Sequence, residues 1–357
     1  MASIKKEKAL VAMSGGVDSS VAAWLILQEG YDCMGATMVL CDHLPGCCPT
    51  GHDSDARAVA QQLGMDFCVL DSQDVFRENV VEDFVKSYEA GLTPNPCIVC
   101  NRTVKFGHLL DQAKALGCQC VVTGHYAQIR YDGNSGRYLL YKAADASKDQ
   151  SYFLASLSQE QLSRARFPLG GMTKEQARQI AEEQGFINAK KRDSQDICFI
   201  PDGDYVAFLK KYTEKEYPIG DYLDVNGKVV GQHKGAVAYT LGQRKGLGIA
   251  LGTPVYVCAK DMAANTVTVG PEEHLFSDTL IAENWNWIPF PALTEPMRVT
   301  AKARSRHNGA PATVYPEADG SARVVFDEPQ RAITPGQAVV LYDGDLVIGS
   351  GTITSAK

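Results

Sequence analysis

Hydrophobic and polar residues alternate in two different ways along the 357-residue chain. In the first half, short apolar runs alternate with stretches in which apolar residues recur every three to four positions, which predicts strands alternating with amphipathic helices. This alternation is typical of an α/β fold, with helices on the faces of a parallel sheet. We expect strands at 9–13, 33–40, 66–70 and 119–123, a hairpin at 126–141, and helices at 20–29, 55–63, 75–89, 105–116 and from Thr173 onward.

The pattern changes after about residue 203. From there we expect one short helix and then many short strands separated by Gly, Asp and Asn turns, which is typical of small β domains. The sequence therefore predicts an α/β domain at 1–203, a β-rich domain at 204–276 and a β-barrel at 277–357.

Composition narrows the class of protein. Hydrophobic residues make up 45% of the chain and charged residues 22%, as in ordinary globular proteins, and no apolar run is long enough to span a bilayer. The first residues lack a signal-peptide pattern, so we expect a cytoplasmic protein with no membrane partner. The net charge of −7 argues mildly against a nucleic-acid partner, although basic residues cluster at 190–192, 244–245 and 298–306.

The segment Ser14-Gly15-Gly16-Val17-Asp18-Ser19-Ser20 follows the first predicted strand and opens a helix. Glycines let the backbone approach an anion, serine hydroxyls add donors, and a helix N-terminus supplies free N–H groups with a partial positive charge. The segment matches neither the Walker loop nor the dinucleotide-binding glycine pattern. We expect a phosphate-binding loop of another kind rather than a generic glycine turn.

Cysteines give the second chemical signal. Eleven of them, in a chain without an export signal, favour reactive thiols or metal ligands over a disulfide framework. Cys97 and Cys100 form a Cys-x-x-Cys at the end of a predicted loop with two prolines, and Cys198 follows about a hundred residues later. These three thiols would suit an enzyme that replaces oxygen by sulfur, because such a reaction needs one thiol that carries sulfur as a persulfide and a second that releases it. An enzyme that forms an amide needs neither thiol.

The other cysteines fall into two groups. Those in or beside predicted strands are expected in the core: Cys33, Cys68, Cys118, Cys120 and Cys258. The segment 41–52 holds Cys41, Cys47 and Cys48, and we expect either a second metal site or, preferably, a loop over the active site.

The segment SGGVDSS resembles the PP-loop of the N-type ATP pyrophosphatases, which split ATP into AMP and pyrophosphate to adenylate a carbonyl oxygen. Over nearly its whole length the chain is also similar to the bacterial tRNA-specific 2-thiouridylases. The matching segments include GLTPNP at 91–96, TGHY at 123–126, KDQSYFL at 148–154, ICFI at 197–200, YTLGQRKGLG at 239–248 and TPGQ at 334–337. This resemblance implies a PP-loop ATP pyrophosphatase domain followed by two β domains that bind tRNA, and an ATP-dependent tRNA-uridine 2-sulfurtransferase.

The reaction implied by the resemblance uses ATP and Mg²⁺ to adenylate the C2 oxygen of the wobble uridine in tRNA. Cys198 would carry the incoming sulfur as a persulfide, and Cys100 would attack that persulfide, leaving a disulfide between the two. The products are 2-thiouridine, AMP and pyrophosphate. The thiolate is the active form, so we expect both thiols beside cations that lower their pKa, with Lys105 and residues 190–192 as candidates.

The resemblance also implies binding residues, with Asp18 positioning the magnesium. The ATP site would comprise Ala12, Met13, Ser14, Gly15, Gly16, Val17, Asp18, Ser19, Met38 and Gly124. The target base would contact Asn95, Pro96 and Cys97. The tRNA would contact His125, Asp149, Gln150, Ser151, Arg304, Ser305 and Gln337, with Arg298, Lys302, Arg304 and Arg306 clamping its backbone.

Several alternatives stay open. Many members of this family have aspartate at position 97, but here Cys97, Cys100 and Cys198 form a trio that could hold a [4Fe–4S] cluster, as in related tRNA thiolases, or less readily zinc. With a cluster, no persulfide cysteine is needed. The sulfur donor is either a cysteine desulfurase or a sulfur-relay protein. Two rival functions are a small-molecule amide ligase and a tRNA-binding or cluster-scaffold protein with an inactive loop; the cysteines argue against the first and the intact PP-loop against the second.

Overall fold

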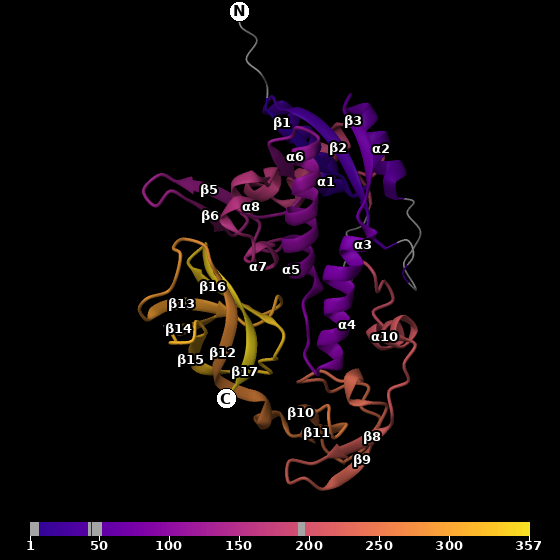
Figure 1. Ribbon diagram of the computed structural model, residues 1–357, viewed down its shortest axis with the longest axis vertical. Helices are drawn as coiled ribbons and strands as arrows, with labels where there is room; N and C mark the ends of the chain where they lie inside the picture. Colours follow the sequence, from indigo (N-terminus) through magenta and orange to yellow (C-terminus); the bar gives the residue numbers. More distant parts are fainter. Residues whose placement is uncertain (1–6, 42–43, 45–51, 192–196) are drawn as a thin grey trace, which may run out of the picture.

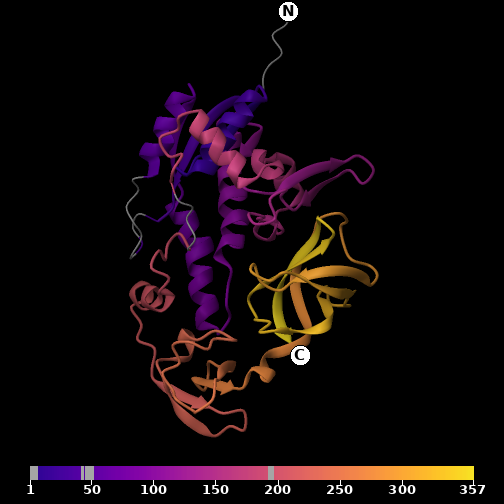
Figure 2. The ribbon, with the colours of Figure 1, turned by 180° about the vertical axis from the view of Figure 1, so that it is seen from behind.

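Three sheets organise the chain (Figures 1 and 2), in a computed structural model that describes residues 7–41, 44, 52–191 and 197–357. The first sheet is parallel throughout, as expected. Its strands are, in spatial order, β3 (Asp66–Asp71), β2 (Asp32–Val39), β1 (Lys8–Ala12), β4 (Cys120–Val122) and β7 (Ala165–Arg166). Around it lie α1 (Val17–Gln28), α2 (His52–Gln62), α8 (Gln159–Arg164), η3 (Pro168–Gly171) and α9 (Lys174–Glu183).

Strand β1 shows why the sequence forms this layer. Ala9 and Val11 pack into one apolar cluster with α1, α2 and α9, whereas Leu10 packs into the cluster on the opposite face. A strand that is buried on both faces needs a continuous apolar run, which is what the sequence has here. The capping box of Thr173 and Gln176 begins α9 as predicted.

Two long helices run side by side from this sheet toward the second one (Figure 1). The first joins α3 (Gln73–Phe76), the π-helical η1 (Arg77–Val81) and α4 (Glu82–Glu89); the second joins α5 (Pro96–Cys100), the π-helical η2 (Asn101–His108) and α6 (Leu109–Ala115). The predicted start of the second helix at residue 105 is wrong. The Asn95 side chain caps the helix by accepting from Ile98 N–H, and Pro96 occupies the first turn, where its missing N–H has no cost.

The central part contains α10 (Tyr205–Thr213) and η4 (Ala236–Ala238) beside a small sheet. Its strands are, in spatial order, β10 (Tyr256–Asp261), β11 (Thr266–Gly270), β8 (Gly220–Leu223) and β9 (Val229–His233). Tyr222, Val257 and Val267 form the centre of its own apolar cluster.

The last part is a closed barrel, which confirms the predicted fold class. After η5 (Glu272–Leu275), its strands are, in spatial order, β12 (Phe276–Trp287), β15 (Ala322–Arg331), β14 (Ala310–Pro316), β13 (Met297–Lys302), β16 (Ala338–Asp343) and β17 (Leu346–Ala356), and β12 pairs with β17 to close it. The hairpin of β5 (Gln128–Asp132) and β6 (Arg137–Tyr141) extends this sheet, because Tyr141 pairs with Leu346. The barrel is therefore joined to the first domain by backbone pairing.

Candidate active site

The PP-loop connects β1 to α1. Ser14 N–H donates to Ser19 Oγ at 3.2 Å, and the Ser19 hydroxyl donates to the Gly16 carbonyl at 3.0 Å. Gly15 has a φ of 71°, a left-handed conformation that favours glycine. These contacts fold the loop against the first turn of α1, so that Ser14, Asp18 and Ser19 border a cavity.

A segment that follows α9 supports the loop from behind. Asn188 Nδ2 donates to the Gly15 carbonyl at 3.2 Å and to Ser20 Oγ at 2.9 Å, and Lys191 Nζ donates to the same carbonyl at 3.1 Å. Lys191 also pairs with Asp55 at 2.8 Å. Lys191 was a candidate for lowering the thiol pKa values, but the structure places it against the PP-loop.

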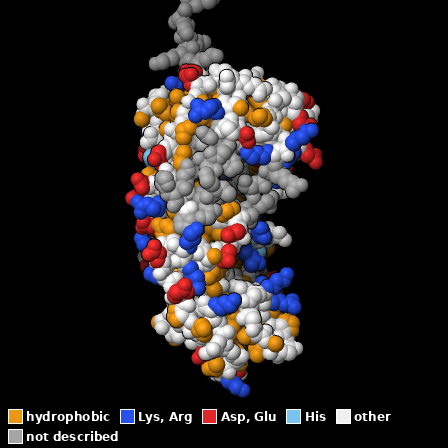
Figure 3. Space-filling model, turned by 90° about the vertical axis from the view of Figure 1, so that its right-hand side faces the viewer, with side chains coloured by type: hydrophobic (Ala, Val, Ile, Leu, Met, Phe, Trp, Pro, Cys, Tyr) orange, Lys and Arg blue, Asp and Glu red, His pale blue; other side chains and the backbone are white. Residues whose placement is uncertain are grey.

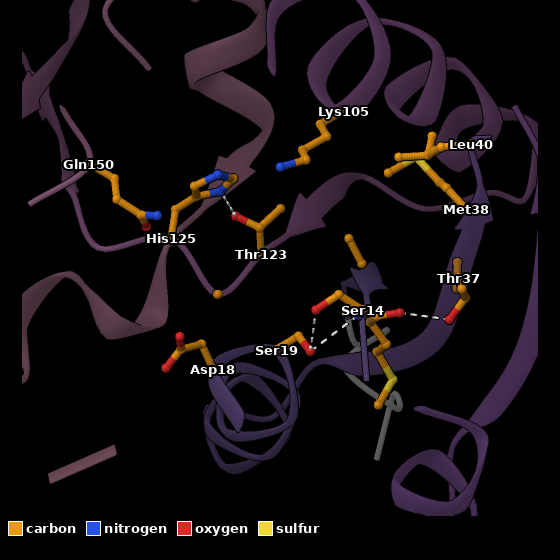
Figure 4. Close-up of a pocket in the computed structure, with 14 residues that line it drawn as sticks. Ser14, Asp18, Ser19, Thr37, Met38, Leu40, Lys105, Thr123, His125 and Gln150 are labelled. Atoms are coloured by element: carbon orange, nitrogen blue, oxygen red, sulfur yellow. Dashed lines mark hydrogen bonds between the residues drawn. The ribbon is translucent and has the colours of Figure 1, made fainter. Parts of the chain in front are cut away.

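The cavity has a volume of about 270 Å³ (Figure 4). Seven of the ten residues expected at the ATP site line it: Ala12, Met13, Ser14, Asp18, Ser19, Met38 and Gly124. His125 and Gln150, expected to contact tRNA, line the same cavity. Sequence reasoning missed Ala36, Thr37, Leu40 and Thr123, which the ends of the parallel strands bring to this place, and it did not put Lys105 in the nucleotide pocket.

Gly124 has a steric role. A Cβ at this position would lie 2.7 Å from the Asp18 carbonyl carbon and 2.8 Å from the Ser19 nitrogen, both of them backbone atoms. The loop after β4 therefore approaches the PP-loop as closely as only glycine permits.

Lys174 and Tyr126 hold the Asp18 carboxylate. Lys174 Nζ donates to its two oxygens at 2.7 and 2.8 Å, and the Tyr126 hydroxyl donates to Oδ1 at 2.8 Å. Lys174 is 9% exposed and is fixed at the start of α9. Sequence reasoning missed both partners, because nothing in the chain order places residues 126 and 174 beside residue 18.

The Cys-x-x-Cys pair lies on a helix, and the expectation of a loop is wrong. Cys97 and Cys100 are one turn apart on α5, so their side chains occupy the same side of it. Cys97 and Cys198 reach solvent, whereas Cys100 is 7% exposed. The charge state of Cys97 or Cys100 changes the pKa of the Cys198 thiol, which indicates that the three thiols share one environment.

The expectation that these thiols have lowered pKa values is not met in this state. Desolvation by surrounding protein atoms raises the pKa of Cys97 and of Cys100, and it raises the pKa of Cys198 to about 12, although Cys97 and Cys198 reach solvent. The Lys105 ammonium opposes this effect at all three. Burial disfavours the charged thiolate more than the Lys105 ammonium favours it.

Lys105 links the thiols to the nucleotide cavity. It lies on η2, five residues after Cys100, and its amine extends into the cavity between His125 and Met38 (Figure 4). Among the described residues it has no hydrogen bond or ion pair. His125 is held by a 2.7 Å hydrogen bond between Nδ1 and Thr123 Oγ1, and burial followed by Lys105 lowers its pKa well below the usual range. The imidazole is therefore neutral.

Several cysteines were expected as possible metal ligands. No three His, Cys, Asp or Glu side chains in residues 7–41, 44, 52–191 and 197–357 lie close enough to hold one ion. Cys33, Cys118 and Cys120 are buried as expected, whereas Cys68 and Cys258 are half-buried. The expected site or lid at 41–52 lies largely outside the described residues, as do Arg192 and the residues 193–196 that precede the ICFI motif.

The residues expected to contact tRNA lie on two domains. Asp149 Oδ1 accepts from Ala143 N–H and Ser151 N–H, which shapes the segment before α7 (Ser151–Leu154). Arg304 is exposed and Ser305 half-exposed after β13, while Gln337 faces the first domain. Arg298 is paired with Asp327 at 2.7 Å, so its charge is already matched.

A parallel sheet whose first strand leads into SGGVDSS above a cavity, followed by two β domains, defines a PP-loop nucleotide-binding α/β protein. Family models match along the chain: a tRNA methyl transferase HUP domain at 7–202, a tRNA methyl transferase PRC-barrel domain at 206–271 and an aminomethyltransferase β-barrel domain at 277–353. None of the described helices is long and apolar enough to cross a membrane.

Curated relatives identify the family. The tRNA-specific 2-thiouridylase MnmA of Acetivibrio thermocellus is 48% identical over 98% of this chain and 100% of its own length, and that of Heliobacterium modesticaldum is 50% identical over 98% of this chain and 92% of its own. The chain belongs to the tRNA-specific 2-thiouridylase (MnmA) family. A solved 4-thiouridine synthetase–RNA complex with bound ATP aligns with 57% of this chain and 50% of its own chain, at 17% identity. The TM-score of 0.35 is too low to carry an argument about chemistry.

Proposed function

We propose that the protein replaces the C2 oxygen of the wobble uridine in tRNA by sulfur, using ATP. The observation that carries this proposal is the junction at Lys105: one amine borders the PP-loop cavity and also acts on the thiols of Cys97, Cys100 and Cys198. Such a junction suits a reaction that activates an oxygen with a nucleotide and then displaces it with sulfur.

ATP binds in the cavity with its phosphates at the PP-loop, held by Ser14, Ser19 and the first turn of α1. Gly15, Gly16 and Val17 shape the loop, and the adenosine part lies toward Met38. Mg²⁺ would contact Asp18 and the phosphate oxygens, since this ion binds through one or two carboxylates plus substrate phosphates. The Asp18 carboxylate suits this role because it borders the cavity, and Mg²⁺ would compete with the Lys174 ammonium for its two oxygens.

Sulfur transfer follows in two displacements. The terminal sulfur of a Cys198 persulfide attacks C2 of the adenylated uridine, and AMP leaves with the former C2 oxygen. The Cys100 thiolate then attacks the Cys198 sulfur, which forms a disulfide and leaves the terminal sulfur on C2 as the thiocarbonyl. A dithiol reductant must restore both cysteines before the next turnover, and a cysteine desulfurase or a sulfur-relay protein reloads Cys198.

The base must leave its stack to reach this chemistry. Asn95, Pro96 and Cys97 would border it at the start of the long helix that also carries Lys105, which lines the cavity. The tRNA would contact His125, Asp149, Gln150 and Ser151 on the first domain, and Arg304, Ser305 and Gln337 on the barrel. The central domain would also bind the tRNA.

The test is ATP-dependent thiolation of unmodified tRNA by protein purified without oxygen, with the product nucleoside identified by mass. We expect sulfur in place of oxygen at C2, with AMP and pyrophosphate in equal amounts. Cys100→Ser and Cys198→Ser abolish thiolation, whereas Cys97→Ser and the distant control Cys258→Ser retain it. A methylated nucleoside, the activity in the family-model descriptions, contradicts the proposal.

The same preparation tests the cluster route. Iron and sulfide in near-stoichiometric amounts, lost together with activity in Cys97→Ser, would replace the persulfide step by a [4Fe–4S] cluster held by Cys97, Cys100 and Cys198. A colourless, active protein that tolerates the loss of Cys97 supports the persulfide.

A further inference from the structure

The barrel touches the first domain at the start of α5, called here the cysteine helix because it carries Cys97 and Cys100. Gln337 Nε2 donates to the Thr93 carbonyl at 2.8 Å and to the Pro94 carbonyl at 3.3 Å, and Thr93 N–H donates to the Pro335 carbonyl at 3.0 Å. Both backbone groups of Thr93 thus have their partners on the barrel. Since a buried backbone group without a partner is costly, these bonds fix the path of the chain into α5.

The barrel turn is itself rigid. Gly336 N–H donates to the Ile353 carbonyl at 2.9 Å, and Ile353 N–H donates back to the Gln337 carbonyl at 2.8 Å. Gly336 has a φ of 90°, and a Cβ there would lie 2.8 Å from Leu92 Cβ and 2.8 Å from Thr93 N. The turn therefore packs directly on the backbone that leads into the helix.

A second path joins the barrel to the other end of α5. The Tyr152 hydroxyl donates to the Ala338 carbonyl on β16 at 2.9 Å, which ties α7 to the barrel. Asn101, the residue after Cys100, donates from Nδ2 to the Phe153 carbonyl of α7 at 3.1 Å. Supports at both ends of the cysteine helix thus lead to β16 and the turn before it.

We propose that the barrel turn Thr334–Gln337 holds Cys97 and Cys100 in their reactive position, with Gln337 as a positioning residue that acts through the backbone of Thr93 and Pro94. That this position is the reactive one rests on the proposed function. That the barrel turn fixes the position of the two thiols does not. On this view the barrel is part of the catalytic scaffold as well as a tRNA-binding surface.

The experiment compares Gln337→Met, which keeps the side-chain length but loses both donors, with Gln159→Met. Gln159 is the matched control, because its amide donates across the domain contact to the Ile288 carbonyl, and also to the Tyr138 carbonyl within the first domain, without touching α5. The alkylation rate of each cysteine is measured by mass spectrometry of its peptide, in the absence of tRNA and ATP. The kcat and the KM for tRNA are measured separately.

In Gln337→Met we expect the buried Cys100 to alkylate at least about threefold faster, because its segment opens more often. We also expect kcat to fall about tenfold or more, since small displacements of reacting groups are costly. Unchanged Cys100 alkylation and unchanged kcat, with only the KM for tRNA raised, would leave Gln337 with tRNA contact alone and overturn the proposal. Equal loosening in Gln159→Met would overturn it as well.

Should Gln337→Met not fold, Gly336→Ala tests the same contact by pushing on Leu92 and Thr93 while leaving every amide in place, and the same two readouts apply. Wild-type protein that fails to thiolate tRNA would count against the proposed function. The tRNA-free alkylation rates would still decide whether the barrel turn positions the cysteines.

Discussion

Among the residues that the structure describes, Lys105 is the one cation that lowers the pKa of all three thiols, and Lys105→Met removes it. Burial already raises these pKa values, and the ammonium partly offsets the rise. Without it each thiol pKa moves up further. A nearby charge in a partly hydrated site shifts a pKa by about one unit, and one unit is a tenfold change in thiolate at any pH well below the pKa.

The sign follows from the thiolate being the nucleophile. Alkylation rates of Cys97 and Cys100 should rise with pH in both proteins, with the Lys105→Met curve displaced toward higher pH and lower by about tenfold at neutral pH. Iodoacetamide labelling across a pH series, without ATP or tRNA, measures the displacement. Lys114→Met is the control, because Lys114 lies on the same long helix but pairs with Asp111 and Glu160 at the surface. Superimposable curves for Lys105→Met and wild type would refute the assignment.

Three further outcomes are expected. Gly124→Ala forces a Cβ against PP-loop backbone atoms, so ATP affinity should fall about tenfold or more and stability by about 1–3 kcal/mol, as nucleotide titration and thermal melts can check. Lys174→Met leaves the partly exposed Asp18 carboxylate without its cationic partner, so the melting temperature should fall and less Mg²⁺ should be required for activity. An unchanged Mg²⁺ titration would contradict this. Arg304→Ala should weaken tRNA binding and reduce its salt dependence by about one ion, whereas the already paired Arg298→Ala should do neither.

Local patterns predicted the parallel sheet and the PP-loop because each depends on neighbours in the chain. The apolar run of β1 reflects burial on two faces, and SGGVDSS carries its own turn and helix start. The same logic failed at residues 93–101, where two prolines indicated a loop. Pro96 instead stands at the first helical position after a capping Asn95, a local helix-start signal that the prediction passed over.

Other features were beyond local reasoning. The long strands β12 and β17 were not predicted, because polar residues interrupt their apolar positions. Asn286 on β12 donates to the carbonyls of Ala155 and Leu157, so a polar side chain there serves the contact between domains. Tyr126 and Lys174 likewise meet Asp18 only through the fold.

The net charge of the chain predicted its partner less well than the pairing of individual charged residues does. A net charge of −7 argued mildly against nucleic acid, yet the chain belongs to a family of tRNA-modifying enzymes. Screening limits a charge to about 10 Å at moderate salt, so a phosphate responds to its local surface rather than to the sum. On the face in Figure 3, basic and acidic side chains are interspersed. A cluster of basic residues in the sequence is also an unreliable guide, because Arg298 forms an ion pair with Asp327 while Arg304 of the same cluster stays exposed. Pairing in the folded chain therefore decides which basic residues can meet a phosphate.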